Sequence, residues 1–359
     1  MTDTTAGIRC MLMRGGTSKG AFFVQDDLPA NSAERDDLLL RIMGSPDPRQ
    51  IDGVGGAHPL TTKVAVVSSS DRDDADVEYL FLQVGVETAF VTDRQNCGNM
   101  LAAVGPFAVE RGLAGVEDGT ATVRILMRNT GGLAVAMFPV QGSLPVYEGE
   151  TEISGVPGSA ARIEIDFAGI AGASSGSLLP TGNPTDVLSG VEATLVDNGM
   201  PVVVVVAAAV GIDGHETCAQ LETDGDLREK LEAIRLEAGP LMGLGDVSEA
   251  TVPKVTLVSP PRQGGAVSTR TFIPHRCHDA IGVLGAVSVA TACLIPGSVA
   301  AGVVGPRTES DVVVLEHPTG SFEARVTMRF DNGVPVVERA GITRTARKLM
   351  DGIVYPRPS

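Results

Sequence analysis

Tryptophan is absent from the 359-residue sequence, and aromatic residues make up only 4% of it. The five cysteines form no Cys-x-x-Cys pair, and their odd number argues against a disulfide framework, so we expect a reducing, cytoplasmic environment. Basic residues are also scarce, since 28 Lys and Arg stand against 44 Asp and Glu, for a formal net charge of −16. A nucleic-acid-binding protein needs a basic surface, so this class is excluded.

Signals for targeting and for membrane insertion are missing too. The first ten residues have neither a basic region nor an apolar core, so we expect no signal peptide. The longest uncharged stretch, residues 280–306, is interrupted by Pro296 and Gly297. It therefore predicts a buried helix over residues 279–294 followed by a loop, rather than a membrane span. We expect no membrane partner.

The composition that remains is typical of a globular protein with two domains. Hydrophobic residues make up 43%, and the length corresponds to about two domains at roughly 150 residues each. Short runs rich in β-branched residues predict many strands, for example at residues 63–67 and 201–207. Helices are predicted at residues 33–43 and 226–236, after Cys97, after Cys277 and, as a short terminal helix, at residues 344–350.

Two segments that begin with cysteine resemble each other. Residues 97–105 and 277–285 both place Gly eight residues after Cys, within a stretch that is small and apolar enough for a buried helix. Chance is the alternative explanation of so short a match. Taken as a repeat, it predicts an α+β fold of two similar domains, each with strands around a central helix. Turn residues at 169–184 place the boundary between domains 1–183 and 184–359, and the last residues are able to pack back on the first domain.

Several motif-like patterns fail on their context. Residues 15–20 resemble a phosphate-binding loop but lack its Gly-Lys-Ser/Thr ending. Residues 172–176 match Gly-x-Ser-x-Gly, yet the prolines that follow prevent the helix that a nucleophile elbow requires. His275, Cys277 and His278 lack the spacing of a zinc site. We expect no metal and interpret these three as polar residues at a helix entry.

Basic residues gather in three stretches of this acidic chain that contain no acid. These stretches, residues 5–25, 53–70 and 250–278, hold Arg9, Arg14, Lys19, Lys63, Lys254, Arg262, Arg270 and Arg276. Together with the backbone amides of Gly-rich turns, they predict a binding site for an anion. The alternative is that these are strand residues whose basic side chains reach solvent.

Lys63 and Cys97 are the candidates for acid-base chemistry. Lys63 opens an apolar run whose side chains would desolvate the ammonium and favour the neutral amine that a general base requires. Cys97 precedes a predicted helix, a place that favours a thiolate and makes it a candidate acid or base. The alternatives are a solvent-exposed lysine at a strand start and a cysteine packed at a helix entry.

A series of motifs then runs in order along nearly the whole chain. It begins with Met13-Arg-Gly-Gly-Thr-Ser-Lys-Gly20 and continues at residues 43–47, 49–53, 95–99, 179–183, 197–201, 273–278 and 344–352. On these motifs the sequence resembles the PrpF protein family, which has a diaminopimelate-epimerase-like fold. That resemblance implies two pseudo-symmetric domains, each a curved, mostly antiparallel sheet around a central helix, with the active site in the cleft between them.

The resemblance also implies an activity. It is that of a cofactor-independent isomerase that catalyses a 1,3-allylic proton shift in an unsaturated tricarboxylate such as 4-oxalomesaconate, in the breakdown of gallate and protocatechuate. Aconitate and methylitaconate are alternative substrates, and a non-catalytic carboxylate-binding protein is an alternative of another class. Related proteins suggest a homodimer.

Individual residues receive roles from the same resemblance. Lys63 is the implied general base and Cys97 the second catalytic residue. The implied substrate-binding residues are Arg14, Gly15, Gly16, Thr17, Ser18, Asn96, Gly98, Asn99, Ser174, Ser175, His275 and Arg276. Two positions depart from the family pattern: Thr62 stands where serine is expected, and Ser175 stands where close relatives have cysteine, which removes a catalytic thiol from that loop.

Overall fold

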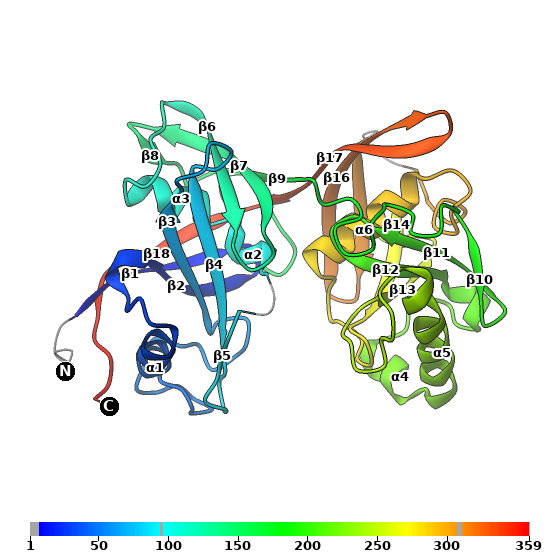
Figure 1. The fold of residues 1–359 in the computed structure, drawn as a ribbon, viewed down its shortest axis with the longest axis horizontal. Coiled ribbons are helices and arrows are strands. Elements are labelled where there is room, and N and C mark those ends of the chain that lie inside the picture. Colours follow the sequence, from blue (N-terminus) through cyan, green and yellow to red (C-terminus); the bar gives the residue numbers. More distant parts are fainter. Residues whose placement is uncertain (1–6, 94–95, 307–310, 359) are drawn as a thin grey trace. The chain divides into compact units, whose positions relative to one another are not determined.

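A computed structural model of the chain describes residues 7–93, 96–306 and 311–358 (Figure 1). Gln95, which belongs to the motif at 95–99, lies outside the described residues. The chain forms two compact units: the first comprises Met1–Asp166 and Arg344–Ser359, and the second comprises Phe167–Thr343. The units therefore change at residue 166, whereas the sequence places the boundary after residue 183. The turn-rich stretch belongs to the second unit because the amides of Ser174 and Ser175 donate to Asp197 there.

The first unit is a mixed sheet with helices on both faces. Its strands are β1 (Ile8–Gly15), β2 (Ser18–Val24), β3 (Lys63–Ser69), β4 (Val77–Val84), β5 (Val91–Thr92), β6 (Gly119–Met127), β7 (Gly132–Gln141), β8 (Leu144–Pro145) and β18 (Ala346–Val354). Its helices are α1 (Ser32–Met43), α2 (Gly98–Leu101) and α3 (Val104–Glu110), with a 3₁₀ turn at Gln25–Asp27. β9 (Ile163–Ala168) continues from the first unit into the second.

The second unit is built from the same kinds of element. Its strands are β10 (Asp186–Leu188), β11 (Val191–Asp197), β12 (Pro201–Val206), β13 (Lys254–Ser259), β14 (Val267–Phe272), β15 (Val312–His317), β16 (Gly320–Asp331) and β17 (Val334–Arg344). Its helices are α4 (Cys218–Thr223), α5 (Gly225–Leu241) and α6 (Val283–Leu294), with a 3₁₀ turn at Ala207–Val210.

Both units repeat one pairing pattern. In the first, β1–β2 is antiparallel, β2–β3 parallel, β3–β4 antiparallel, β4–β6 parallel and β6–β7 antiparallel. The second repeats this alternation from β11 through β12, β13, β14 and β15 to β16. Parallel neighbours need a crossover, and helices fill each one: α1 and α2–α3 in the first unit, α4–α5 and α6 in the second. This repeat confirms the α+β fold that the two cysteine-led segments predict.

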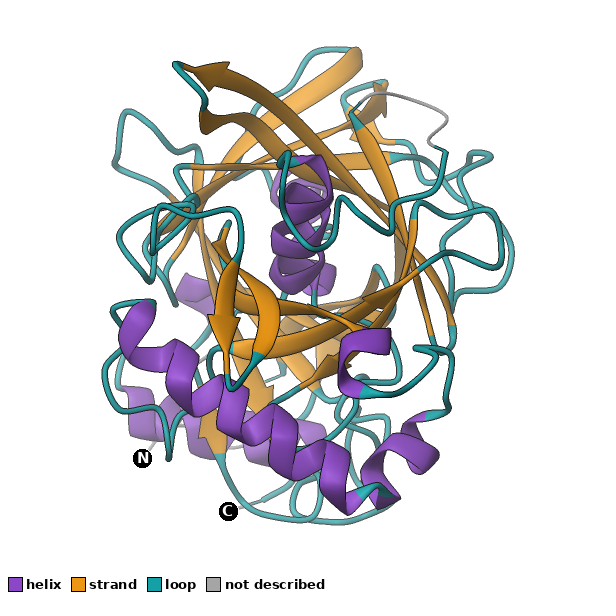
Figure 2. Ribbon diagram, turned by 90° about the vertical axis from the view of Figure 1, so that its right-hand side faces the viewer, coloured by secondary structure: helices purple, strands orange, loops and turns teal. Residues whose placement is uncertain are grey.

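One helix in each unit lies on the concave face of its sheet. α6 packs against β11, β12, β15 and β16, and α3 packs against β3, β6 and β7; Figure 2 shows such a helix enclosed by curved strands. α6 begins at Val283, later than the residue 279 that we predict, because Gly282 before it has an extended backbone. Cys277 therefore does not start the helix and instead bridges to Phe272. Within the described parts of the chain, no helix is both long enough and apolar enough to cross a membrane.

The opposite face of the first sheet carries α1. Asn31 caps this helix, because its Oδ1 accepts hydrogen bonds from the amides of Ala33 at 2.9 Å and Glu34 at 3.2 Å. Leu39 and Ile42 of α1 are buried in one cluster with Val64 and Val66 of β3. Since side chains alternate along a strand, Lys63 and Ala65 point to the other face, where α2 and α3 lie.

The short terminal helix predicted at residues 344–350 is wrong. Residues 346–354 form the strand β18, which pairs antiparallel with β1 from Ile8 to Gly15. A helix of seven residues gains little in isolation, whereas a strand beside β1 gains a complete hydrogen-bond ladder. The local propensity is thus overridden by a pairing with residues more than 300 positions away.

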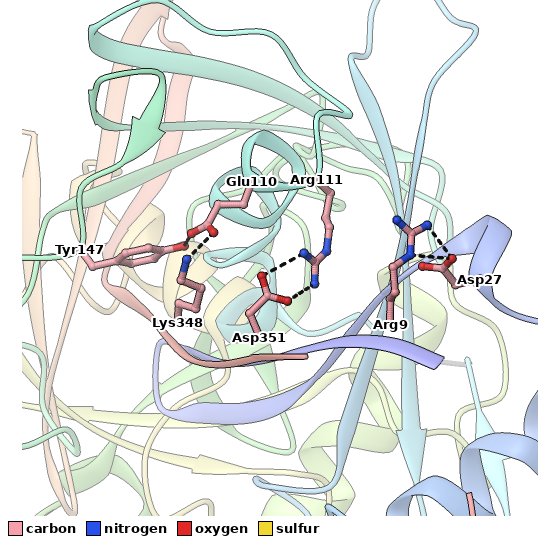
Figure 3. Close-up of polar contacts among 7 residues, drawn as sticks. All are labelled: Arg9, Asp27, Glu110, Arg111, Tyr147, Lys348 and Asp351. Carbon is pink, nitrogen blue, oxygen red and sulfur yellow. Dashed lines mark hydrogen bonds and ion pairs between the residues drawn. The ribbon is translucent and has the colours of Figure 1, made fainter. Parts of the chain in front are cut away.

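Ion pairs join the end of α3 to β18, and we call them the C-terminal clasp (Figure 3). Arg111 donates two hydrogen bonds to Asp351, at 2.6 and 3.0 Å. Glu110 accepts from Tyr147 at 2.7 Å and from Lys348 at 2.5 Å. The hydrogen bond from Arg111 lowers the pKa of Asp351 below its ordinary value of 3.8.

The clasp predicts a pH-dependent loss of stability. Because the pKa of Asp351 is lowered by folding, its carboxylate stabilises the folded chain above pH 3.8, and this contribution disappears as the pH falls through the folded pKa. Replacement of Asp351 by Asn should lower the melting temperature at pH 7, and the difference from wild type should shrink as the pH falls below 3.8. Asp52→Asn, at an exposed position, is the control. A difference that persists unchanged at pH 3 would contradict the role of ionised Asp351.

Candidate active site

Lys63 is buried at the start of β3. Its side chain is on the face that carries α2 and α3, and the residue is only 6% exposed, so the alternative of a solvent-exposed lysine is wrong. Its Nζ donates a hydrogen bond of 2.7 Å to Oε1 of Gln83, the residue opposite it on β4. The same Nζ lies 5.1 Å from the ring centroid of Phe81. The amine is thus fixed by one neutral acceptor and one aromatic face.

Cys97 immediately precedes α2, as the sequence predicts. Its backbone is extended and its thiol makes no capping hydrogen bond, while its carbonyl accepts from the amide of Leu101 at 3.0 Å. α2 has a single turn, so its dipole gives less support to a thiolate than a long helix would. The same carbonyl lies 3.4 Å from the hydroxyl of Tyr79.

One row of side chains on β4 connects these two candidates. Tyr79, Phe81 and Gln83 are two residues apart and share a face of the sheet. Gln83 and Phe81 contact the amine of Lys63, and Tyr79 contacts Cys97. Burial raises the pKa of Tyr79 well above its usual range, with a smaller contribution from the charge of Cys97, so the phenol stays neutral.

The turn between β1 and β2 packs directly on α2. A Cβ at Gly15 would lie 2.4 Å from the carbonyl oxygen of Asn99, and one at Gly16 would lie 2.2 Å from Oδ1 of Asn99. Gly16 also has a φ of +51°, which disfavours any side chain. Asn99 Nδ2 donates to Thr17 Oγ1 at 3.1 Å, and Asn99 Oδ1 accepts from Arg344 at 3.1 Å. The implied binding residues of this turn and of α2 therefore lie together.

Arg14 holds the turn in place. Its Nη1 donates to the carbonyls of Gly16 and Thr345 and to Oγ1 of Thr345, at 2.9 to 3.0 Å. Burial lowers the pKa of Arg14, and the nearby charge of Arg347 lowers it further. The contacts of Nη1 thus shape the backbone from Gly15 to Ser18.

Ser18 supplies a hydroxyl without a partner. It is 2% exposed, and among the described residues nothing hydrogen-bonds to its Oγ. Ser18 and Gly20 are two residues apart on β2 and therefore share a face of the sheet. Gly20 is the residue of β2 that pairs with Lys63 of β3. A buried hydroxyl without a partner is costly unless a ligand or water satisfies it. Ser18 is therefore suited to bind a polar group that approaches Lys63.

Asn96 lies next to Cys97 but points to a different element. Its Nδ2 donates to Thr130 Oγ1 at 3.2 Å and contacts the sulfur of Met127 at 3.1 Å. Its Oδ1 is buried without a partner within the described chain. Gly98 is the first residue of α2.

The implied residues of the second unit lie at two places within it. Oδ2 of Asp197 accepts from the amides of Ser174 and Ser175 and from Ser175 Oγ, each at 2.9 Å. His275 and Arg276 face helices instead: His275 Nδ1 is 3.7 Å from Glu232 of α5, and Arg276 Nε is 3.4 Å from Glu222 of α4. Their side chains are 54% and 83% exposed.

The remaining cysteine and histidine at this loop have structural contacts. Cys277 is buried, and burial raises the pKa of its thiol, with a further contribution from Cys218. Burial lowers the pKa of His278, whose Nδ1 accepts from the amide of Ala280. Across residues 7–93, 96–306 and 311–358, no three Cys, His, Asp or Glu side chains gather as metal ligands would.

Sequence reasoning misses Gln83 and Tyr79. The only signal available is that a polar side chain and a phenol alternate with Phe81 on an otherwise apolar strand. This pattern points to a contact with Lys63 only when the β3–β4 register is known, because that register places Gln83 opposite Lys63. Neither motif spacing nor composition supplies this register.

Comparison with known proteins identifies the group to which the chain belongs. The model of the family described as PrpF protein matches residues 5–357. (4E)-Oxalomesaconate Delta-isomerase of Novosphingobium sp. is 58% identical over 347 residues, 96% of this chain and 96% of that protein. 4-Oxalomesaconate tautomerase of Pseudomonas putida is 56% identical over 348 residues, 97% of this chain and 95% of that protein.

A solved structure agrees with these relatives. The crystal structure of a methylitaconate-delta-isomerase superposes with a TM-score of 0.89 at 34% identity, covering 99% of this chain and 96% of that one. Since the family match and both relatives span almost the entire sequence, the resemblance drawn from the motifs is confirmed. The chain belongs to the PrpF protein family.

Proposed function

We propose that this chain is a cofactor-independent isomerase that moves a carbon–carbon double bond in 4-oxalomesaconate or a closely related unsaturated tricarboxylate. Support for the substrate comes from the two relatives that carry oxalomesaconate in their names and are 56% and 58% identical. The observation that carries the chemistry is the buried amine of Lys63, which lies on the same face of the sheet as Ser18 and as Tyr79, the contact of the Cys97 carbonyl.

The proposed reaction is a 1,3-allylic proton shift. Lys63, as the neutral amine, removes a proton from the carbon that is vinylogous to the keto acid, and the electron pair forms a dienolate. The same amine, now an ammonium, returns a proton to the other end of the allylic system, so that no atom is gained or lost. Negative charge on the keto and carboxylate oxygens needs hydrogen-bond donors that are already in place. Ser18 Oγ is our candidate because it has no partner among the described residues, whereas the amide of Gly16 already donates to the carbonyl of Thr345 at 2.9 Å.

Other parts of the proposal rest on the family resemblance. Thr17, Asn99 and the residues of the second unit, Ser174, Ser175, His275 and Arg276, are carried as substrate-binding residues on that basis. A homodimer is proposed in the same way and is tested by sedimentation equilibrium. A cytoplasmic location agrees with five cysteines that are all free.

Proton NMR in D₂O tests the function. Purified protein is added separately to 4-oxalomesaconate, cis-aconitate and methylitaconate. We expect double-bond migration with deuterium entering one allylic carbon, fastest with 4-oxalomesaconate. Faster turnover of methylitaconate would favour the second candidate, which the similarity to the methylitaconate-delta-isomerase structure supports. Absence of exchange in all three, with the protein shown to be folded, would refute the proposal.

Cys97 provides a prediction about the second proton transfer. Because Lys63 is able to carry the proton both ways, Cys97→Ser should lower turnover by only about tenfold, far less than the loss of a general base. Steady-state kinetics of Cys97→Ser are compared with those of Cys218→Ser, whose thiol contacts the carbonyl of His278 in the second unit. If Cys97→Ser loses as much turnover as removal of Lys63, the cysteine is an equal partner that protonates the second carbon.

A further inference from the structure

Gln83 is held in a single orientation. Its Nε2 donates to three backbone carbonyls: Thr62 at 3.0 Å, Pro59 at 3.2 Å and Val84 at 3.2 Å. Only the amide nitrogen is able to donate, so the three carbonyls determine which end of the amide faces them. Oε1 must therefore face the amine of Lys63, which donates to it at 2.7 Å.

Thr62 is itself held in place by hydrogen bonds of its side chain. Thr62 is fully buried, and its hydroxyl donates to Oε1 of Gln50 at 2.7 Å. Nε2 of Gln50 in turn donates to Ser45 Oγ at 2.9 Å. Oε1 of Gln50 also accepts from the backbone amide of Ala57 at 2.8 Å. These contacts form a chain of buried and partly buried hydrogen bonds that ends at the base. The threonine that departs from the family pattern keeps its hydroxyl in this chain.

From these contacts we infer that Gln83 is a positioning residue for the general base, which deepens the proposed function and rests on it. A neutral lysine has two N–H groups and one lone pair. Accepting one N–H through Oε1 restricts the amine and directs its lone pair away from Gln83. Because this acceptor is a neutral amide, it orients the amine without the full negative charge that would hold the lysine as ammonium.

A purely structural role is the competing explanation. Gln83 joins β4 to the end of the 59–62 segment, and its loss would loosen that segment whether or not Lys63 is a base. The two explanations differ in the turnover of the folded variant. Loss of a structural residue lowers the folded fraction and leaves kcat per folded molecule in place, whereas loss of a positioning residue lowers kcat of the folded molecule with little change in KM.

Gln83→Glu tests whether residue 83 contacts the base during turnover, and Gln83→Met tests whether that contact positions the base. A carboxylate next to the amine favours the ammonium, so the rising limb of kcat/KM against pH should move up by about one unit or more, with activity at pH 7 reduced about tenfold and recovering at high pH. Gln83→Met removes the acceptor and should lower kcat at least tenfold with little change in KM, because the amine is no longer oriented. Gln141→Glu, at an exposed end of β7, is the matched control for added charge.

Two results would overturn the inference. One is a Gln83→Glu profile that coincides with wild type. The other is a Gln83→Met variant whose activity falls only in proportion to the fraction unfolded, as measured by circular dichroism under assay conditions. Either would leave Gln83 as a structural residue.

A measurement without substrate separates this inference from the proposed function. The rate at which acetic anhydride acetylates Lys63 is followed against pH by peptide mass spectrometry, since only the neutral amine reacts. Gln83→Glu should move this labelling curve to higher pH, and Gln141→Glu should not. If wild type turns over none of the three acids but the curve moves, the proposed isomerase fails and the pairing stands. If the isomerase is active but neither the curve nor the pH profile moves, the inference fails alone.

Discussion

Lys63→Met should lower kcat by a factor of about 10² to 10⁴, the range expected when a general base is removed. Methionine has a similar length but cannot accept a proton, and it fits the apolar surroundings that Phe81 provides. Substrate binding should persist, because the candidate binding hydroxyl of Ser18 is untouched. The measurement is kcat by proton NMR and binding of 4-oxalomesaconate by calorimetry.

The control is Lys230→Met on α5, which makes the same substitution in the other unit. Lys63→Met also leaves Oε1 of Gln83 without its donor, so its fold is checked by circular dichroism before kinetics. Turnover within a few-fold of wild type, in a folded variant that binds substrate, would remove Lys63 from the mechanism. The base would then have to be sought elsewhere on the same face of the sheet.

The site could be predicted from the sequence where its residues follow one another along the chain. The glycines of the β1–β2 turn and the Cys97 segment are contiguous motifs, and the structure brings both together through Asn99. Lys63 begins an apolar run, and residues 63–67 are all buried, as that run predicts. Each of these features is local, so a local pattern is enough to find it.

Features that depend on pairing between distant segments could not be predicted. Gln83 faces Lys63 only because β3 and β4 pair in one register, and Thr345 meets Arg14 only because β18 returns to β1. Residues 344–350 have a local composition compatible with a helix, so the strand is decided by β1 and not by the segment itself. The Cys277 segment resembles the Cys97 segment in sequence, yet Cys277 bridges to Phe272 and α6 begins only after the extended Gly282.

Gly20 of β2 lies directly against the backbone of Lys63. It pairs with Lys63 in the parallel ladder, and a Cβ there would lie 2.4 Å from the carbonyl oxygen of Lys63 and 2.5 Å from Cε of Met100. The methionine end is flexible and is able to move aside. The backbone of Lys63 has less freedom, because Gln83 and the carbonyl of Thr62 are hydrogen-bonded on its other side.

Gly20→Ala should therefore destabilise the chain by about 1–3 kcal/mol, the usual cost of overpacking a close contact. It should also reduce kcat by roughly tenfold to a hundredfold, because a shift of about 1 Å in a reacting group is enough for such a loss. Urea denaturation gives the free energy of unfolding, and kcat is measured on the folded fraction.

Gly115→Ala is the matched control, since a Cβ there meets no atom within 4 Å and the backbone is not left-handed. Its stability should stay within about 0.5 kcal/mol of wild type, with kcat unchanged. The decisive comparison is between stability and turnover in Gly20→Ala. If stability falls but kcat is retained, β2 has moved and left the amine of Lys63 in place, so the base is positioned by β4 alone. If both fall together while Gly115→Ala remains normal, the geometry of the base depends on contact with both neighbouring strands.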